Sequence, residues 1–316
     1  MKYINEYHEG DYCKGIFLCK SKQVLTARTG KTYYSLILQD KTGTVDAKIF
    51  DINSGIDEFD SADYIDVIGQ VSNFQGNVQW KLTRARKASE DEYNIEDYLM
   101  ASKYDREEMF FELVSLMSCV KNPYLRKLID MFLNADDKFI GEFKSHAAAK
   151  SVHHSFMGGL LEHTLNVVRI CNFIGDNYPV IDKELLMTAA LFHDIGKMKE
   201  LSSFPEDEYT DEGQMLGHIY IGAEMIGKAI KAVPDFPATL ATELKHCILA
   251  HHGELEFGSP KKPAIVEAIA LNMADNLDAK MEIMTETFDN AGDNMDWLGF
   301  NRMIDSNIRQ TYGTKR

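Results

Sequence analysis

The chain has 316 residues, 45% of them hydrophobic, which is enough to form packed cores in two domains. Its formal net charge of −15 disfavours nonspecific binding of the whole chain to a polyanion. No apolar run is long enough to span a bilayer, the first residues lack a signal-peptide pattern, and the five scattered cysteines form no CxxC pair. These features argue against a membrane protein and a disulfide framework, and we expect a reduced, cytoplasmic chain.

The N-terminal part of the chain, to about residue 88, combines strand patterns with short turns. Residues 44–50 alternate apolar and polar side chains, as a half-buried strand does. Short strands joined by a D-x-T-G turn, here Asp40 to Gly43, resemble the OB-fold of nucleic-acid-binding domains. The resemblance implies an all-β barrel, and we assign residues 1–90 to an OB-fold nucleic-acid-binding domain. The expected strands are 31–40, 44–50, 65–71 and 78–82, with turns at 41–43 and 74–77.

Basic and aromatic residues are interleaved in this expected barrel. Residues 12–50 carry seven Lys or Arg against two acids, and residues 71–88 carry four Lys or Arg and no acid. By contrast, residues 51–70 carry six acids and no base, so we expect this stretch to face away from a ligand. Cations along the phosphates and aromatic rings beneath the bases are typical of single-strand binding. The candidate strand-binding residues are Lys31, Tyr33, Tyr34, Phe74, Lys81 and Arg84, whereas Phe50 and Trp80 are expected in the core.

A helical part follows an acidic connector at residues 89–94. Helical patterning dominates from residue 105 to residue 143, with a break at Asn122-Pro123. We assign residues 91–144 to a connector and helical extension. Near the C-terminus the pattern predicts a loop followed by a last helix from Trp297.

Methionine-rich helical faces occur in this last region. Such faces are more typical of a core or a subunit interface than of a catalytic site, so a homo-oligomer is compatible with the sequence. The residues concerned are Met281, Met284 and Met303.

The most informative motif is His193-Asp194, which ends an apolar helical stretch and precedes Gly196 and Lys197. Adjacent helical residues point about 100° apart, so these two side chains rarely pair but can both lean toward one ion. Imidazole and carboxylate groups suit divalent Mn, Fe, Co or Zn. Residues of the same types lie in helix-like context on both sides of the doublet: His163, His218, His251, His252 and Asp275.

This order of residues resembles the HD-domain metallophosphohydrolase superfamily over roughly residues 145 to 290. The resemblance implies a metal-dependent phosphohydrolase built as an all-α helical bundle, which we assign to residues 145–316. Gly159 stands where members with three metals have a glutamate, which favours two ions or one. The implied ligands are His163, His193, Asp194 and Asp275 for one ion, and Asp194, His218 and His251 for a second. His252 is either a ligand or a substrate contact.

Two such ions, about 3.5–4 Å apart, would share Asp194 and stabilise charge on a phosphoryl group. Lys197 shares a helical face with His193 if the helix continues across Gly196, and is a candidate phosphate clamp or acid for the leaving oxygen. The candidate catalytic residues are Asp194, Lys197 and His252. Ahead of the first ligand helix, Lys150, His153 and His154 either contact a substrate phosphate or cap the domain.

An OB-fold, a helical extension and an HD domain in one chain resemble the YhaM-type 3′-to-5′ exoribonucleases of Gram-positive bacteria. The resemblance implies removal of 5′-mononucleotides from the 3′ end of single-stranded RNA, or of single-stranded DNA, with manganese or cobalt as the cofactor. Two alternatives remain open. One is an HD phosphohydrolase that acts on nucleotides or cyclic dinucleotides, with the OB-fold as a regulatory module. The other is a binding protein whose metal site is structural.

Overall fold

The protein is described by a computed structural model over residues 2–26, 30–74, 77–98, 101–149, 156–204, 207–292 and 294–314. Contacts divide the chain into two compact units: residues 1–101 with 204–206, and residues 102–203 with 207–316. Each unit has its own hydrophobic core. The first is an all-β barrel and the second is largely helical, so the predicted fold class is confirmed.

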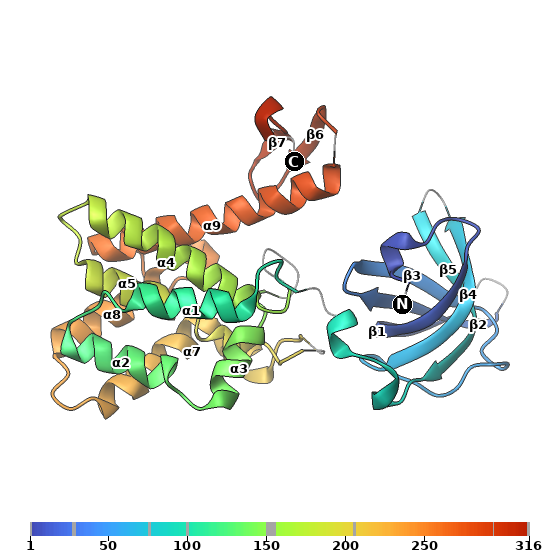
Figure 1. The fold of residues 1–316 in the computed structure, drawn as a ribbon, viewed down its shortest axis with the longest axis horizontal. Coiled ribbons are helices and arrows are strands. Elements are labelled where there is room, and N and C mark those ends of the chain that lie inside the picture. The colour runs from blue at the N-terminus through green and yellow to red at the C-terminus, as the bar shows by residue number, and fades with distance from the viewer. Residues whose placement is uncertain are drawn as a thin grey trace. The chain divides into compact units, whose positions relative to one another are not determined.

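The first unit is a closed barrel of five strands (Figure 1). Its strand order is β1-β2-β3-β5-β4, and β1 pairs with β4 to close it. All neighbouring strands are antiparallel except β3 and β5, which are parallel. This order is that of a five-stranded OB-type barrel. The strands are β1 Tyr12–Thr26, β2 Thr32–Asp40, β3 Gly43–Ile49, β4 Tyr64–Phe74 and β5 Asn77–Lys87.

The barrel core forms because alternate residues of each strand point inward. Along β3, Val45, Ala47 and Ile49 are buried, and along β5 the ring of Trp80 is fully buried. Trp80 packs edge-on against Phe17 at a centroid distance of 4.9 Å. Gly69 allows β4 and β5 to approach, since a Cβ there would lie 2.4 Å from the carbonyl oxygen of Lys81.

The second unit is a helical bundle in which α4 packs against α1, α3, α5 and α9. Its helices are α1 Arg106–Met117, α2 Pro123–Leu133, α3 Asp137–Ser145, α4 Gly159–Asn177, α5 Lys183–Phe192, α6 Lys197–Glu200, α7 Asp211–Ala232, α8 Ala238–Ala250 and α9 Val266–Ala291. Short 3₁₀ turns occur at Ile4–Glu6, Glu90–Glu92, Ile95–Asp97, Leu255–Phe257 and Tyr312–Thr314. The helices of the predicted extension, α1 to α3, belong to the same compact unit as α4 to α9.

Helix boundaries in this unit follow local sequence signals. Asn122 caps α2 by accepting hydrogen bonds from the backbone N–H groups of Tyr124 and Leu125, and Pro123 occupies the first turn. Asp182 caps α5 in the same way. The predicted break at Asn122-Pro123 is therefore confirmed.

The predicted C-terminal helix from Trp297 is wrong. The region instead forms a two-stranded hairpin of β6 Trp297–Asn301 and β7 Ser306–Arg309, after α9 has continued to Ala291. Gly299 adopts a positive φ of 95°, a backbone angle that glycine tolerates but that does not occur within a right-handed α-helix. Figure 1 shows this hairpin at the end of α9.

Among the described residues, every helix is too short or too polar to cross a lipid bilayer.

Candidate metal centre and strand-binding surface

Five segments of the helical unit deliver the predicted ligands to one place. His163 lies in the first turns of α4, while His193 and Asp194 directly follow α5. His218 lies in α7 just after a kink at Gly217. His251 and His252 follow α8, and Asp275 lies within α9.

A first cluster forms around His163. Its Nε2 atom lies 3.1 Å from Nε2 of His193, 3.2 Å from Oδ1 of Asp275 and 3.3 Å from Oδ2 of Asp194. The side chains of His163 and His193 are buried, and that of Asp275 is only 15% exposed. Two imidazoles and two carboxylates thus converge on one small volume, which is a donor set for a divalent cation.

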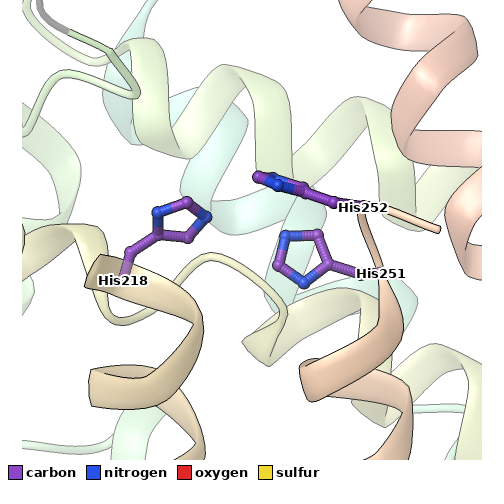
Figure 2. A group of neighbouring side chains, drawn as sticks. All are labelled: His218, His251 and His252. Carbon is purple, nitrogen blue, oxygen red and sulfur yellow. The ribbon is translucent and has the colours of Figure 1, made fainter. Parts of the chain in front are cut away.

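A second cluster contains three imidazoles. His218, His251 and His252 each offer a ring nitrogen within 4.8 Å of the others. Figure 2 shows the three rings converging from two separate helix segments, with His251 and His252 adjacent at the end of one of them. The geometry therefore groups His252 with the ligand candidates.

Asp194 lies between the two clusters and turns one oxygen toward each. Its Oδ2 atom faces His163, whereas its Oδ1 atom lies 3.4 Å from Nε2 of His218 and 3.6 Å from Nε2 of His251. Oδ1 of Asp194 and the Nε2 atoms of His218 and His251 are buried without a hydrogen-bond partner. Buried polar atoms normally have partners, so three orphaned acceptors that face one another fit a shared cation.

Every histidine in the centre has its Nδ1 atom engaged. Backbone carbonyl oxygens accept the Nδ1 protons of His193, His251 and His252, at 2.7–2.8 Å. Carboxylates do so for the other two: Asp278 at 2.7 Å for His163 and Glu200 at 3.0 Å for His218. These contacts hold each ring with its Nε2 atom directed at the centre, as metal-binding histidines require.

Asp278 and Glu200 are the two residues of this centre that sequence reasoning missed. Asp278 follows Asp275 by three residues, so the two share a face of α9, and that spacing could have indicated it. Glu200 had no such signal, because its partner His218 lies 18 residues away in another helix.

The electrostatics of the centre favour ionised carboxylates. Burial alone would raise the pKa of Asp194, but neighbouring Lys197 and the histidines lower it below its usual value. Burial also lowers the pKa values of His193 and His252, each to about 4, so these rings are neutral at pH 7 and can donate their lone pairs. Burial opposes protonation of His163 as well, yet hydrogen bonds to three carboxylates raise its pKa. The surroundings of His163 therefore attract positive charge.

Lys197 contacts the carboxylate of Asp194 directly. The condition for a helical face shared with His193 is not met, because α5 ends at Phe192 and α6 begins at Lys197 after a turn. The ammonium nevertheless reaches Oδ2 of Asp194 at 2.6 Å, and its side chain is only 12% exposed. Burial lowers the pKa of Lys197, but the charge of Asp194 outweighs this and the pKa is raised overall.

Three predicted substrate contacts, Lys150, His153 and His154, lie outside the described residues.

The strand-binding candidates of the barrel divide between its two faces. Tyr33 lies on the outer face of β2, and its ring is 5.6 Å from that of Phe50, which is 53% exposed. Phe50 was predicted in the core, and this is wrong: alternation from the buried Val45, Ala47 and Ile49 puts residue 50 outside. Tyr34 was predicted to contact the strand, but it packs against the barrel core and contacts the Phe59 ring edge-on. Trp80 is buried, as predicted.

Basic residues also lie on the outside of the barrel. Lys48 of β3 and Lys81 of β5 are register partners, and Lys81 is exposed. Lys31 is exposed just before β2. Arg84 is exposed beyond a bulge, where it pairs with Ile68 of β4. The backbone of Phe74 ends β4, and its side chain lies outside the described part of the chain.

Comparison with known proteins agrees with this geometry. The family model for the HD domain matches residues 160–280, a range that contains all of the convergent histidines and carboxylates. This match lies within the helical unit. An HD domain indicates a metal-dependent phosphohydrolase, and the two clusters could hold a divalent metal.

Solved structures similar to this chain include three with OB folds or bound single strands. One is the second OB-fold domain of replication protein A from Methanococcus maripaludis, at 16% identity and a TM-score of 0.23, covering 28% of this chain and 95% of that one. Another is the OB domain of a Thermoplasma acidophilum protein, at 15% identity and a TM-score of 0.22, covering 30% and 89%. A replication protein A heterotrimer bound to ssDNA also matches, at 15% identity and a TM-score of 0.22, and the match covers 28% of this chain and 64% of that one. The assignment of the barrel as OB-like rests on its own strand order.

Proposed function

We propose that the protein is a divalent-metal-dependent 3′-to-5′ exonuclease of single-stranded RNA that also accepts single-stranded DNA and releases 5′-mononucleotides. The observation that carries the proposal is the position of Asp194, with one oxygen facing each of two ligand clusters. An OB-type barrel in the same chain supports a polynucleotide rather than a small-molecule substrate.

The residues divide into two ligand sets. His163, His193, Asp275 and Oδ2 of Asp194 would hold one ion, and His218, His251, His252 and Oδ1 of Asp194 would hold the other. Imidazole and carboxylate donors suit manganese, and equally cobalt, iron or zinc. Such a pair of ions would activate water and stabilise the charge that develops at phosphorus.

The protein groups around these ligands have separate roles. Asp194 would hold the two ions at a fixed separation because both of its oxygens are engaged. Lys197 retains its proton at neutral pH and places a positive charge beside Asp194, where it can attract a substrate phosphate. His252 presents a neutral ring at the edge of the second cluster, which suits a metal ligand better than a proton donor.

The barrel would hold the strand ahead of the reaction. The half-buried ring of Tyr33 and the exposed ring of Phe50 form an aromatic pair, and Lys48 and Lys81 are register partners on neighbouring strands. Bases can stack on the rings while the ammonium groups follow the phosphates. We therefore propose the outer face of β2, β3 and β5 as the single-strand interface.

The proposal is tested with 5′-labelled RNA of about 20 nucleotides, longer than the site of one OB fold. With Mn²⁺, a free 3′ hydroxyl should give a ladder that shortens one nucleotide at a time, and a blocked 3′ end should leave the strand intact. Asp194→Asn, which keeps the shape of the side chain, controls for contaminating nucleases. Equal cleavage of blocked and free strands would contradict exonuclease action. Turnover of nucleotides or cyclic dinucleotides, with both strands untouched, would favour a small-molecule phosphohydrolase instead.

A further inference from the structure

Glu200 is fixed against the second cluster by two hydrogen bonds. Its Oε1 atom accepts the backbone N–H of His218 at 2.9 Å and the Nδ1–H of the same residue at 3.0 Å. The side chains of Glu200 and His218 are 12% and 13% exposed. One carboxylate thus holds both the main chain and the ring of a candidate ligand.

Backbone contacts between α6 and α7 leave Glu200 little freedom to move. A Cβ on Gly213 would lie 2.1 Å from the carbonyl oxygen of Glu200, and one on Gly196 would lie 2.1 Å from that of His218. Gly217 has a φ of 71°, and this kink in α7 directs the N–H of His218 toward Glu200. The two helices therefore meet backbone to backbone around the His218–Glu200 pair.

Asp278 plays the corresponding part in the first cluster. Its Oδ2 atom accepts the Nδ1 proton of His163 at 2.7 Å, and its side chain is 8% exposed. The other three histidines of the centre donate to backbone carbonyl oxygens instead. Each cluster thus contains one histidine that is oriented by a carboxylate, and the two carboxylates act on different clusters.

We propose that Glu200 and Asp278 are positioning residues that set the affinities of the two metal ions separately: Glu200 that of the second cluster and Asp278 that of the first. The inference rests on the proposed metal centre. A carboxylate behind an imidazole fixes its tautomer and makes its free nitrogen a stronger donor, and losing such a partner typically weakens metal binding by about 10–100-fold.

The test measures binding of Mn²⁺ alone to the full chain by calorimetry, without substrate. Glu200→Ala should lower the affinity for one of two Mn²⁺ ions by about 10–100-fold and leave the affinity for the other unchanged. Asp278→Ala should lower the affinity for the other ion by a similar factor. Combining both should weaken both ions. Combining Glu200→Ala with His252→Ala should lower the affinity for only one of the two ions, because both changes act on the second cluster.

Glu200→Gln guards against a folding defect. The amide keeps an oxygen that can accept both N–H groups, so this variant should fold and bind the second ion more weakly than wild type but more tightly than Glu200→Ala. Glu212→Ala, an exposed acid in the first turn of α7, is the matched control and should bind as wild type. If Glu200→Gln and Asp278→Asn both bind two ions with wild-type affinity, the inference is overturned. If wild type itself takes up no Mn²⁺, the proposed function fails instead.

Discussion

Lys197 offers a direct test of how charge is balanced in the metal centre. Its ammonium lies 2.6 Å from Oδ2 of Asp194, and the two side chains are 12% and 2% exposed. Lys197→Met keeps much of the length of the side chain and removes only the charged end. In protein stripped of metal by a chelator, Asp194 would then be a buried carboxylate without the ammonium group that contacts it.

The expected magnitude follows from that burial. Removing one partner of a buried ion pair destabilises a protein by about 3–5 kcal/mol. For a unit of this size, each kcal/mol lowers the melting temperature by about 2–4 °C, so the helical unit should melt about 6–20 °C lower. With saturating Mn²⁺ the ions would compensate Asp194, and the loss should shrink to about 1 kcal/mol, the scale of one hydrogen bond.

Calorimetric melting with chelator and with Mn²⁺ measures this difference. Lys199→Met is the matched control, because Lys199 lies on the same short helix and is exposed, and it should leave both melting temperatures unchanged. Equal destabilisation of Lys197→Met with and without Mn²⁺ would mean that Asp194 is not a metal ligand.

Three further predictions concern binding and folding. Phe50→Ala should weaken binding of a single-stranded RNA by about 5–150-fold, because one stacking contact is worth about 1–3 kcal/mol. Fluorescence anisotropy measures this affinity, and Tyr12→Ala, which removes an exposed ring from β1, is the control. Unchanged affinity of Phe50→Ala would remove the aromatic pair from the interface. Trp80→Ala should destabilise the barrel by about 3–5 kcal/mol, because the ring is fully buried. In a calorimetric scan only the barrel transition should move, and a shift of both would show that the two units do not unfold separately. Asn122→Ala removes the cap of α2 and should cost about 1 kcal/mol in urea denaturation, whereas Asn122→Asp, which keeps an acceptor oxygen, should cost less. Equal losses for the two variants would show that the cap is not the cause.

Much of the candidate metal centre could be predicted because its candidate ligands have characteristic residue types in a characteristic order. His163, His193, Asp194, His218, His251 and Asp275 come from five segments, and the structure brings their side chains together. The carboxylates behind them could not be predicted so readily. Glu200 is only one of many acids in an acidic chain. Its contact with His218 depends on a kink at Gly217 that no sequence pattern predicts.

In the barrel, the errors come from assigning single residues to faces. Tyr34 lies two and four residues before the buried Leu36 and Leu38, so strict alternation along β2 would have placed its side chain inside the barrel. Phe50 follows Ile49 and lies outside for the same reason. Strands β2 to β5 were predicted because β-branched and aromatic residues alternate between turns, a signal that extends over many residues. Strand β1, Tyr12–Thr26, was not among the expected strands.

The C-terminal hairpin is a region where the spacing of apolar residues predicts the wrong secondary structure. Trp297, Phe300 and Met303 have the spacing of a helical face, but all three are exposed in the hairpin. Glycine and asparagine residues in this stretch weaken a helix, and Asp305 at a φ of 56° marks the turn that joins the strands.

Anomalous diffraction from crystals soaked in Mn²⁺ would show whether Asp194 joins two metal sites. We expect two peaks. One should lie within bonding distance of His163, His193, Asp275 and Oδ2 of Asp194, and the other beside His218, His251, His252 and Oδ1 of Asp194. Peaks elsewhere, or none at saturating Mn²⁺, would contradict this expectation.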